Sequence, residues 1–193
     1  AAEMAAALAV AEADLPPRPL QPPQLSAQPA PSPRVLTGQI SQAGSTRELL
    51  RLATTHRASL NQIHVANLWN KLGKQRDASG PSHREEMRQL LRRTVELVDS
   101  DSCDARALSN IAHGLANCSN PNNLSRKSAP VSPSNPKSWL VGLDGETGTL
   151  FAAVAKAAVR GGLGDFKPQE LANTAWAFAK AGHRAPALLD AIA

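Results

Sequence analysis

The chain has 193 residues, of which 42% are apolar and 19% charged, and it contains no apolar run of the roughly 18 residues that a transmembrane helix needs. This composition argues against a membrane-spanning protein. Aromatic residues make up only 3% and tyrosine is absent, which favours helices over sheets. The formal net charge of +5 is compatible with a polyanionic partner.

Residues 1–37 have the composition of a disordered linker. The segment is rich first in alanine and then in proline. Such a chain buries too little apolar surface to offset the entropy lost on folding. It also lacks the basic amphipathic pattern of an organelle transit peptide. We therefore predict that the folded part begins near residue 38.

Three related units follow this linker, and each contains an asparagine in a similar apolar context. Asn67, Asn110 and Asn173 each have Leu or Phe five residues later. The asparagines are 43 and then 63 residues apart, and the excess of 20 matches a stretch rich in Pro, Ser and Asn. We predict repeats 1 and 2 in 38–119, a low-complexity, disordered insert at 120–140, and repeat 3 with the start of a truncated fourth repeat in 141–193.

The second helix of each unit has a predicted start six residues before the shared asparagine. Asn61, Asp104 and Lys167 occupy this position, and apolar residues stand just before it and four residues after it, as in a hydrophobic staple. Asn61 and Asp104 are good N-caps. Lys167 is not, although Pro168 suits the first helical position.

A first helix precedes each of these second helices. In the second unit, apolar residues between 87 and 98 recur with the 3.6-residue period of one buried face. Helical hairpins that cannot bury their own faces alone are expected to stack. The sequence therefore predicts an all-α fold, an α-solenoid of about three helix-turn-helix repeats of the tetratricopeptide or pentatricopeptide kind.

The stretch from Phe166 to Gly182, FKPQELANTAWAFAKAG, resembles the second helix of octotricopeptide repeats. The same pattern occurs in the helical region of RAP-domain and FAST-kinase-like proteins. In the first two units, Asn70 and His113 stand where the family has the tryptophan that is Trp176 here. The resemblance implies a solenoid that binds single-stranded RNA in a chloroplast or mitochondrion and acts in transcript stability, processing or translation.

Aromatic and amide residues of the second helices have two possible roles. Trp176 and Phe178 could stack on RNA bases. Both continue an apolar helical period, however, so we predict that both pack in the core. The shared asparagines could contact base edges, but an unvarying residue cannot discriminate bases, and we expect them to bond backbone at the turn between helices.

The first helices share a pattern of two basic residues four positions apart. We take these pairs as the candidate RNA-binding residues. They flank the predicted buried stripe, and stacking is expected to align them into one track that neutralises phosphates. A merely solvated helix edge is the alternative. The candidates are Arg47, Arg51, Arg88, Arg92, Lys156 and Arg160.

No pattern in the sequence indicates catalysis, a cofactor or a metal site. Cys103, Cys118 and His113 lack the paired spacing of zinc ligands. The aspartates at 99–104 lack the EF-hand arrangement, and the glycines at 161–164 lack the Lys-Ser/Thr of a P-loop. We expect a non-enzyme without cofactor, metal, membrane or small-molecule substrate.

The expected function is that of an organellar RNA-binding helical-repeat protein that acts by occupying single-stranded RNA. A protein–protein interaction scaffold, or an accessory subunit of an organellar ribosome, is the alternative, because helix-pair arrays also bind peptides. In either case, other proteins of an RNA-processing or ribosomal complex are possible partners. The salt dependence of binding distinguishes an RNA-binding protein from a protein scaffold, since RNA binding weakens steeply with ionic strength.

Overall fold

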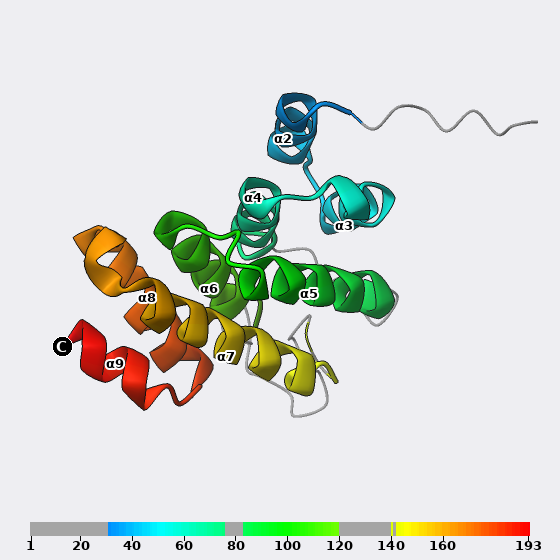
Figure 1. Ribbon diagram of the computed structural model, residues 1–193. Coiled ribbons are helices and arrows are strands. Elements are labelled where there is room, and N and C mark those ends of the chain that lie inside the picture. Colours follow the sequence, from blue (N-terminus) through cyan, green and yellow to red (C-terminus); the bar gives the residue numbers. More distant parts are fainter. Residues whose placement is uncertain (1–30, 76–82, 120–139, 141) are drawn as a thin grey trace, which may run out of the picture.

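A computed structural model describes residues 31–75, 83–119, 140 and 142–193, and in this part the chain forms helices and no strand (Figure 1). The predicted all-α fold is thus confirmed. Two short 3-10 helices, Arg57–Ser59 and Leu163–Asp165, precede α4 and α8. The α-helices are α2 (Pro33–Gln42), α3 (Thr46–Thr55), α4 (Gln62–Leu72), α5 (Arg84–Asp99), α6 (Ala105–Ser119), α7 (Asp144–Gly161), α8 (Pro168–Ala181) and α9 (Pro186–Ile192).

The helices alternate between two layers. α3, α5, α7 and α9 pack side by side in chain order and form the first-helix layer (Figure 1). α2, α4, α6 and α8 pack in the same way and form the second-helix layer. Each predicted hairpin, α3–α4, α5–α6 and α7–α8, therefore contributes one helix to each layer.

The N-terminal boundary differs from the expectation. α2 begins at Pro33, inside the predicted linker, because proline is well tolerated at the first position of a helix. Leu36 and Ile40, one turn apart, are both fully buried, and α2 packs on α4. The disorder predicted for 1–37 and 120–140 falls mostly on residues outside the described part and stays a prediction.

The predicted starts of the second helices are confirmed. The side chain of Asn61 accepts a hydrogen bond from the His64 backbone N–H at 3.1 Å, and Asp104 accepts one from Ala107 at 2.7 Å. The side chain of Lys167 has no acceptor atom and makes no such cap. There the Glu170 carboxylate accepts from the Lys167 backbone N–H instead, at 3.0 Å.

The core lies between the two layers. Its largest buried side chain, Trp69 of α4, donates from Nε1 to Thr94 Oγ1 of α5 at 3.0 Å, which satisfies the indole N–H away from water. Phe178 of α8 is also fully buried, as predicted, and meets Phe151 of α7 edge-on with ring centroids 5.1 Å apart.

α4 and α6 approach each other at backbone distance. A methyl group on Gly114 would overlap the carbonyl of Trp69 and lie 2.9 Å from the Asn70 nitrogen. A methyl group on Gly73 would lie 2.9 Å from the carbonyl oxygen of Gly114. Only glycine allows this approach, and it brings the end of α4 against the middle of α6.

Candidate nucleic-acid interface

The sequence-predicted basic pairs all lie in the first-helix layer, and all but Arg88 are exposed. The three pairs occupy different helices: Arg47 and Arg51 are in α3, Arg88 and Arg92 in α5, and Lys156 and Arg160 in α7.

Two of these six cations are already engaged in ion pairs. Arg88 donates from Nε to Glu146 of α7 at 2.8 Å and from a terminal nitrogen to Glu85 at 2.9 Å. The hydrogen bonds from Arg88 lower the pKa of both carboxyls. Arg160 pairs with Asp101. These two guanidinium groups would have to leave a carboxylate before they could bind phosphate.

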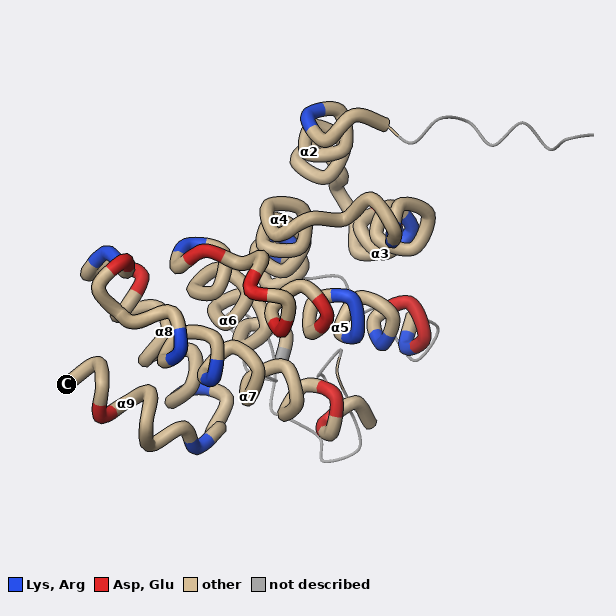
Figure 2. The backbone as a smooth tube through the Cα atoms, in the orientation of Figure 1, with Lys and Arg blue, Asp and Glu red and all other residues tan. Residues whose placement is uncertain are grey.

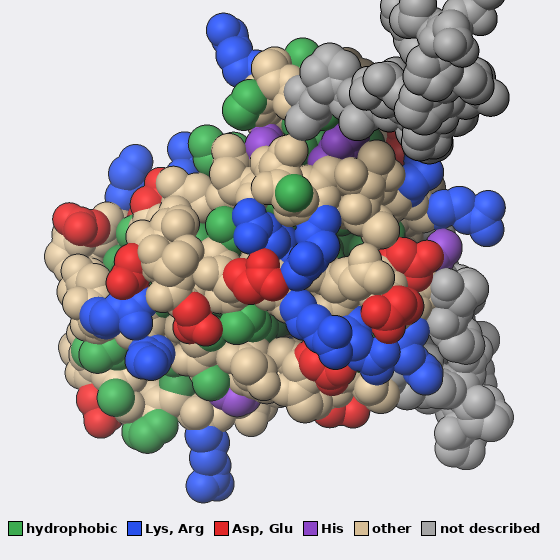
Figure 3. Space-filling view, turned by 45° about the vertical axis from the view of Figure 1, so that its right-hand side comes forward, with side chains coloured by type: hydrophobic (Ala, Val, Ile, Leu, Met, Phe, Trp, Pro, Cys, Tyr) green, Lys and Arg blue, Asp and Glu red, His purple; other side chains and the backbone are tan. Residues whose placement is uncertain are grey.

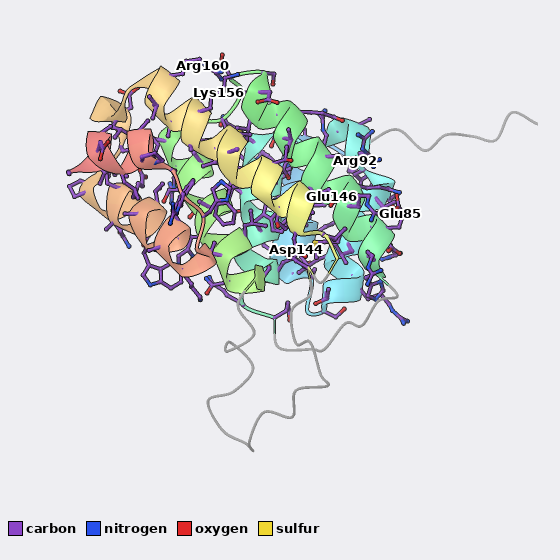
Figure 4. All side chains as sticks on the ribbon, turned by 90° about the horizontal axis from the view of Figure 1, so that it is seen from below. Glu85, Arg92, Asp144, Glu146, Lys156 and Arg160 are labelled. Carbon is purple, nitrogen blue, oxygen red and sulfur yellow. The ribbon has the colours of Figure 1, made fainter. Side chains whose placement is uncertain are left out.

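The expected single track is not formed between α5 and α7. Arg88 lies against Glu146, near the start of α7, whereas Arg160 at the other end of α7 lies against Asp101, beyond the end of α5. Figure 4 shows Lys156 and Arg160 at one end of α7 and Arg92 near the other. The basic pattern recurs in the sequence, but it sits at a different height along each helix.

Acidic side chains are also interleaved with basic ones over this layer. Figure 2 shows Asp and Glu among the Lys and Arg of α5 and at the start of α7. Figure 3, turned so that the α3 and α5 side comes forward, shows blue and red side chains in alternation. A polyanion approaching this side would therefore meet mixed charge.

Sequence reasoning missed the outer side of the second-helix layer, which we call the second-helix face. Its residues recur three and seven positions after the shared asparagines, a spacing that places them on one side of each helix. The residues at the first of these positions are Asn70, His113 and Trp176, and at the second Lys74, Asn117 and Lys180.

Trp176 is 44% exposed, so the prediction that it packs in the core is wrong. At 100° per residue, Trp176 and Phe178 point about 200° apart, and only one of them can face the core. Ala172, one turn before Trp176, is exposed as well. The apolar stripe through Ala172 and Trp176 therefore lies on the second-helix face.

Four side chains connect α6 to α8 on this face, and we call them the α6–α8 cluster. The rings of Trp176 and His113 have centroids 4.9 Å apart. Lys180 Nζ lies 4.4 Å from the centre of the Trp176 ring and donates to Asn117 Oδ1 at 2.7 Å. Asn117 Nδ2 in turn lies 3.3 Å from His113 Nδ1.

The three shared asparagines belong to the same face. Asn67, Asn110 and Asn173 are half-buried within α4, α6 and α8, rather than at the turns between helices as expected. Their side chains make no hydrogen bond with any residue that the structure describes. Each amide is therefore left available for an external donor or acceptor.

Carboxylates are nearly absent from the helices that form this face. α4, α6 and α8 contain one acidic residue, Glu170, which caps the start of α8. No ion pair to Lys74, Arg106 or Lys180 occurs in the described ranges. Burial lowers the pKa of Lys180. The second-helix face thus carries its positive charge without internal neutralisation.

Neither cysteine has the environment of a reactive or metal-binding thiol. Burial raises the pKa of both Cys103 and Cys118 to about 12, so both are neutral thiols near pH 7. In the described part of the chain, no three His, Cys, Asp or Glu residues gather as metal ligands. No helix there is long and apolar enough to cross a membrane.

Comparisons with known proteins found no matching family model, no matching curated protein and no matching solved structure. The residues that resemble octotricopeptide repeats therefore remain the basis of that family prediction. The fold and the face together define a two-layered helical protein with a basic, aromatic side.

Proposed function

We propose that the chain is a stretch of octotricopeptide-like α-solenoid that binds single-stranded RNA on its second-helix face. The alternation of helices between two layers supports the solenoid, because each hairpin buries its apolar stripes against the next hairpin. The common positions of Asn61, Asp104 and Lys167 at the helix starts support a repeated unit.

The observation that carries this proposal is the exposed indole of Trp176 with the Lys180 ammonium over its ring. Every base has a flat face that stacks on an aromatic side chain, and such stacking is worth about 1–3 kcal/mol per base. An ammonium group beside the ring is suitably placed for the phosphate that accompanies a stacked base.

The row of unpartnered amides supports the same assignment. Asn67, Asn110 and Asn173 are identical, so they suit groups that recur in every nucleotide, such as sugar and phosphate oxygens. The residues three positions later differ between helices, as positions that contact different bases should. A basic face with a single carboxylate, Glu170, is also better suited to a polyanion than to a protein partner.

The sequence-predicted cations have a secondary place in this proposal. Arg47, Arg51, Arg92 and Lys156 are exposed and can contact the flanking parts of an RNA strand. The protein would act by occupying the RNA and shielding it from nucleases or from pairing. The organelle, a chloroplast or a mitochondrion, follows only from the resemblance.

Anisotropy of a labelled oligouridine of about 12 nucleotides tests this proposal. We expect Trp176→Ala to lower affinity by about 5- to 150-fold, the equivalent of one stacked base. Lys180→Gln should also weaken binding. Arg57→Gln is the control, because it removes an exposed cation that lies outside the second-helix face and is already paired with Glu96, and it should leave affinity within about twofold.

Two results would contradict the proposal. If Lys156→Gln and Arg92→Gln weaken binding while Trp176→Ala does not, the RNA lies on the first-helix layer. If no single strand binds at low salt, the chain is not an RNA-binding protein. Binding of a protein partner that persists at high salt would then favour the scaffold function.

A further inference from the structure

The α6–α8 cluster contains a hydrogen-bonded chain that joins an imidazole to an ammonium through one amide. Lys180 Nζ donates to Asn117 Oδ1 at 2.7 Å, and Asn117 Nδ2 lies 3.3 Å from His113 Nδ1 and 3.1 Å from the His113 carbonyl oxygen. The three residues come from adjacent helices, α6 and α8, on the second-helix face.

The ammonium fixes the orientation of this amide. A lysine ammonium can only donate, so it must face the Asn117 oxygen. The Asn117 NH2 group then faces His113, and a donor needs an acceptor opposite it. His113 Nδ1 therefore carries no proton in the free protein, and the ring is neutral, with its proton on Nε2.

The charged groups around His113 act in the same direction. Burial, Lys180 of α8 and Lys74 beyond α4 all lower its pKa. Cys118, on the same helix, is a neutral thiol, and α4, α6 and α8 bring no carboxylate to this end of the face. No carboxylate in the described surroundings stabilises a positive charge on the ring, and the Trp176 indole 4.9 Å away is the group there that favours one.

We propose that His113 takes up a proton when RNA binds and becomes a third cation between Lys74 and Lys180, with Asn117 as the switch. This inference rests on the RNA-binding function proposed above. When a phosphate draws the Lys180 ammonium away, Asn117 Oδ1 loses its donor. The amide then turns by half a rotation and presents Oδ1 to His113, whose Nδ1 takes a proton from solution and donates it to this oxygen.

The free state satisfies the hydrogen bonds of the Asn117 amide, including the one to the His113 carbonyl oxygen at 3.1 Å. The bound state gives up that bond, and the turned Oδ1 must also move off this carbonyl, because two acceptor oxygens repel. In the free state, the Lys180 ammonium donates to Asn117 Oδ1, and the Asn117 NH2 group donates to His113 Nδ1. In the bound state, the imidazolium donates to Oδ1, the turned NH2 group is free to donate to phosphate, and the ammonium binds phosphate. The carbonyl of His113 keeps its helical bond from the Asn117 backbone. Only α6 can carry this switch, because Asn70 and Trp176 hold the corresponding positions in α4 and α8.

The sign of the pH dependence follows from this switch. RNA raises the pKa of His113 above its value in the free protein, so the complex binds one more proton. Affinity therefore increases as the pH falls through the interval between the two pKa values. It is constant above and below that interval, and the slope is at most about tenfold per pH unit.

The test measures affinity for the same oligouridine between about pH 5 and pH 8, where histidine titrates. The wild-type chain is expected to bind more tightly at the acidic end. His113→Gln should bind with no such gain, since glutamine cannot take up a proton. His56→Gln is the matched control. It removes a half-buried histidine at the end of α3, and the gain should persist.

A wild-type affinity that does not change with pH, or a gain that persists in His113→Gln, would overturn this inference while RNA binding itself stands. Absence of RNA binding at every pH would instead refute the proposed function and the inference with it. NMR titration of the His113 ring in the wild-type chain, with and without oligouridine, gives a second readout that needs no variant. An unchanged pKa on binding would also overturn the inference.

Discussion

Trp176 and Phe178 are two residues apart in α8 and have opposite environments, one 44% exposed and the other fully buried. The cause is the helical period, which turns them to opposite sides. Phe178 packs against Phe151 between α7 and α8, whereas Trp176 lies against His113 and Lys180 of the α6–α8 cluster.

We expect Phe178→Ala to lower the free energy of unfolding by about 3–5 kcal/mol, because it leaves a cavity beside Phe151. Trp176→Ala should lower it by only about 1 kcal/mol, through the lost ring and ammonium contacts. Urea denaturation followed by circular dichroism measures both. Equal losses in the two variants would mean that Trp176 also supports the core.

The contact between α4 and α6 depends on Gly114. A methyl group there would overlap the Trp69 carbonyl, so Gly114→Ala must push the helices apart and should destabilise the chain by about 1–3 kcal/mol. Gly38→Ala in α2 is the control, because its added methyl group meets no atom within 4 Å beyond the neighbouring residues and backbone of α2 itself.

The control should be neutral or stabilise the chain by up to about 1 kcal/mol, since alanine is the better helix former. The midpoint of thermal unfolding checks both glycine variants. Similar midpoints for the two would show that α4 and α6 can separate without loss.

Individual helices begin where local side chains satisfy the first backbone N–H groups. Asp104 accepts from Ala107 N–H, and its own N–H donates to Gln62 of α4 at 2.7 Å. The start of α6 is thus tied to the start of α4. Lys167 provides no such cap at α8, where Pro168 and Glu170 take over this role.

We predict that Asp104→Ala lowers the free energy of unfolding by about 1 kcal/mol, the usual contribution of an N-cap. Asp104→Asn retains the side-chain acceptor and should have little effect on the free energy of unfolding. Lys167→Ala should also have little effect, because Lys167 provides no side-chain cap. Chemical denaturation distinguishes these cases. A full loss in the asparagine variant would indicate that charge, and not the cap hydrogen bond, stabilises α6.

Across the whole molecule, charge is distributed unevenly between the two layers. The first-helix layer combines cations with carboxylates, as in the Arg88–Glu146 pair, whereas the helices of the second-helix face contain one carboxylate, Glu170, and the described cations Lys74 and Lys180 have no ion pair. Only cations that are not already paired release counterions from RNA at full effect.

A salt titration of RNA affinity measures this difference. Each lost phosphate contact lowers the slope of log affinity against log salt by about 0.7 for a single strand. Changing Lys74 and Lys180 together to glutamine should therefore lower it by about 1.4. The matched double change at Arg88 and Arg92 should lower it less, because Arg88 is held by Glu85 and Glu146. Equal slopes for the two variants would contradict the assignment of the face.

Much of this fold could be predicted because the determining interactions are local. Caps at Asn61 and Asp104, apolar periods and the shared asparagines predict the helices, their starts and their pairing within a few neighbouring residues. α2 escaped prediction because the prolines around it resemble a linker, although Pro33 at a first helical position is compatible with a helix.

The candidate site was not predictable in the same way. A sequence period shows that Ala172 and Trp176 share one side of a helix, but not whether that side meets the core or solvent. Likewise, a basic pattern that recurs in the sequence does not show whether its residues lie level with one another on neighbouring helices. Packing does, and it places Arg88 against Glu146 and Arg160 against Asp101.

The amino-acid sequence by itself therefore determined the helices from α3 onward, because helix formation depends on residues within one or two turns. Tertiary structure alone decided which side of the second helices is exposed and which cations remain unpaired. Both depend on contacts between residues distant in the sequence, such as Lys180 with Asn117, and no local pattern records those contacts.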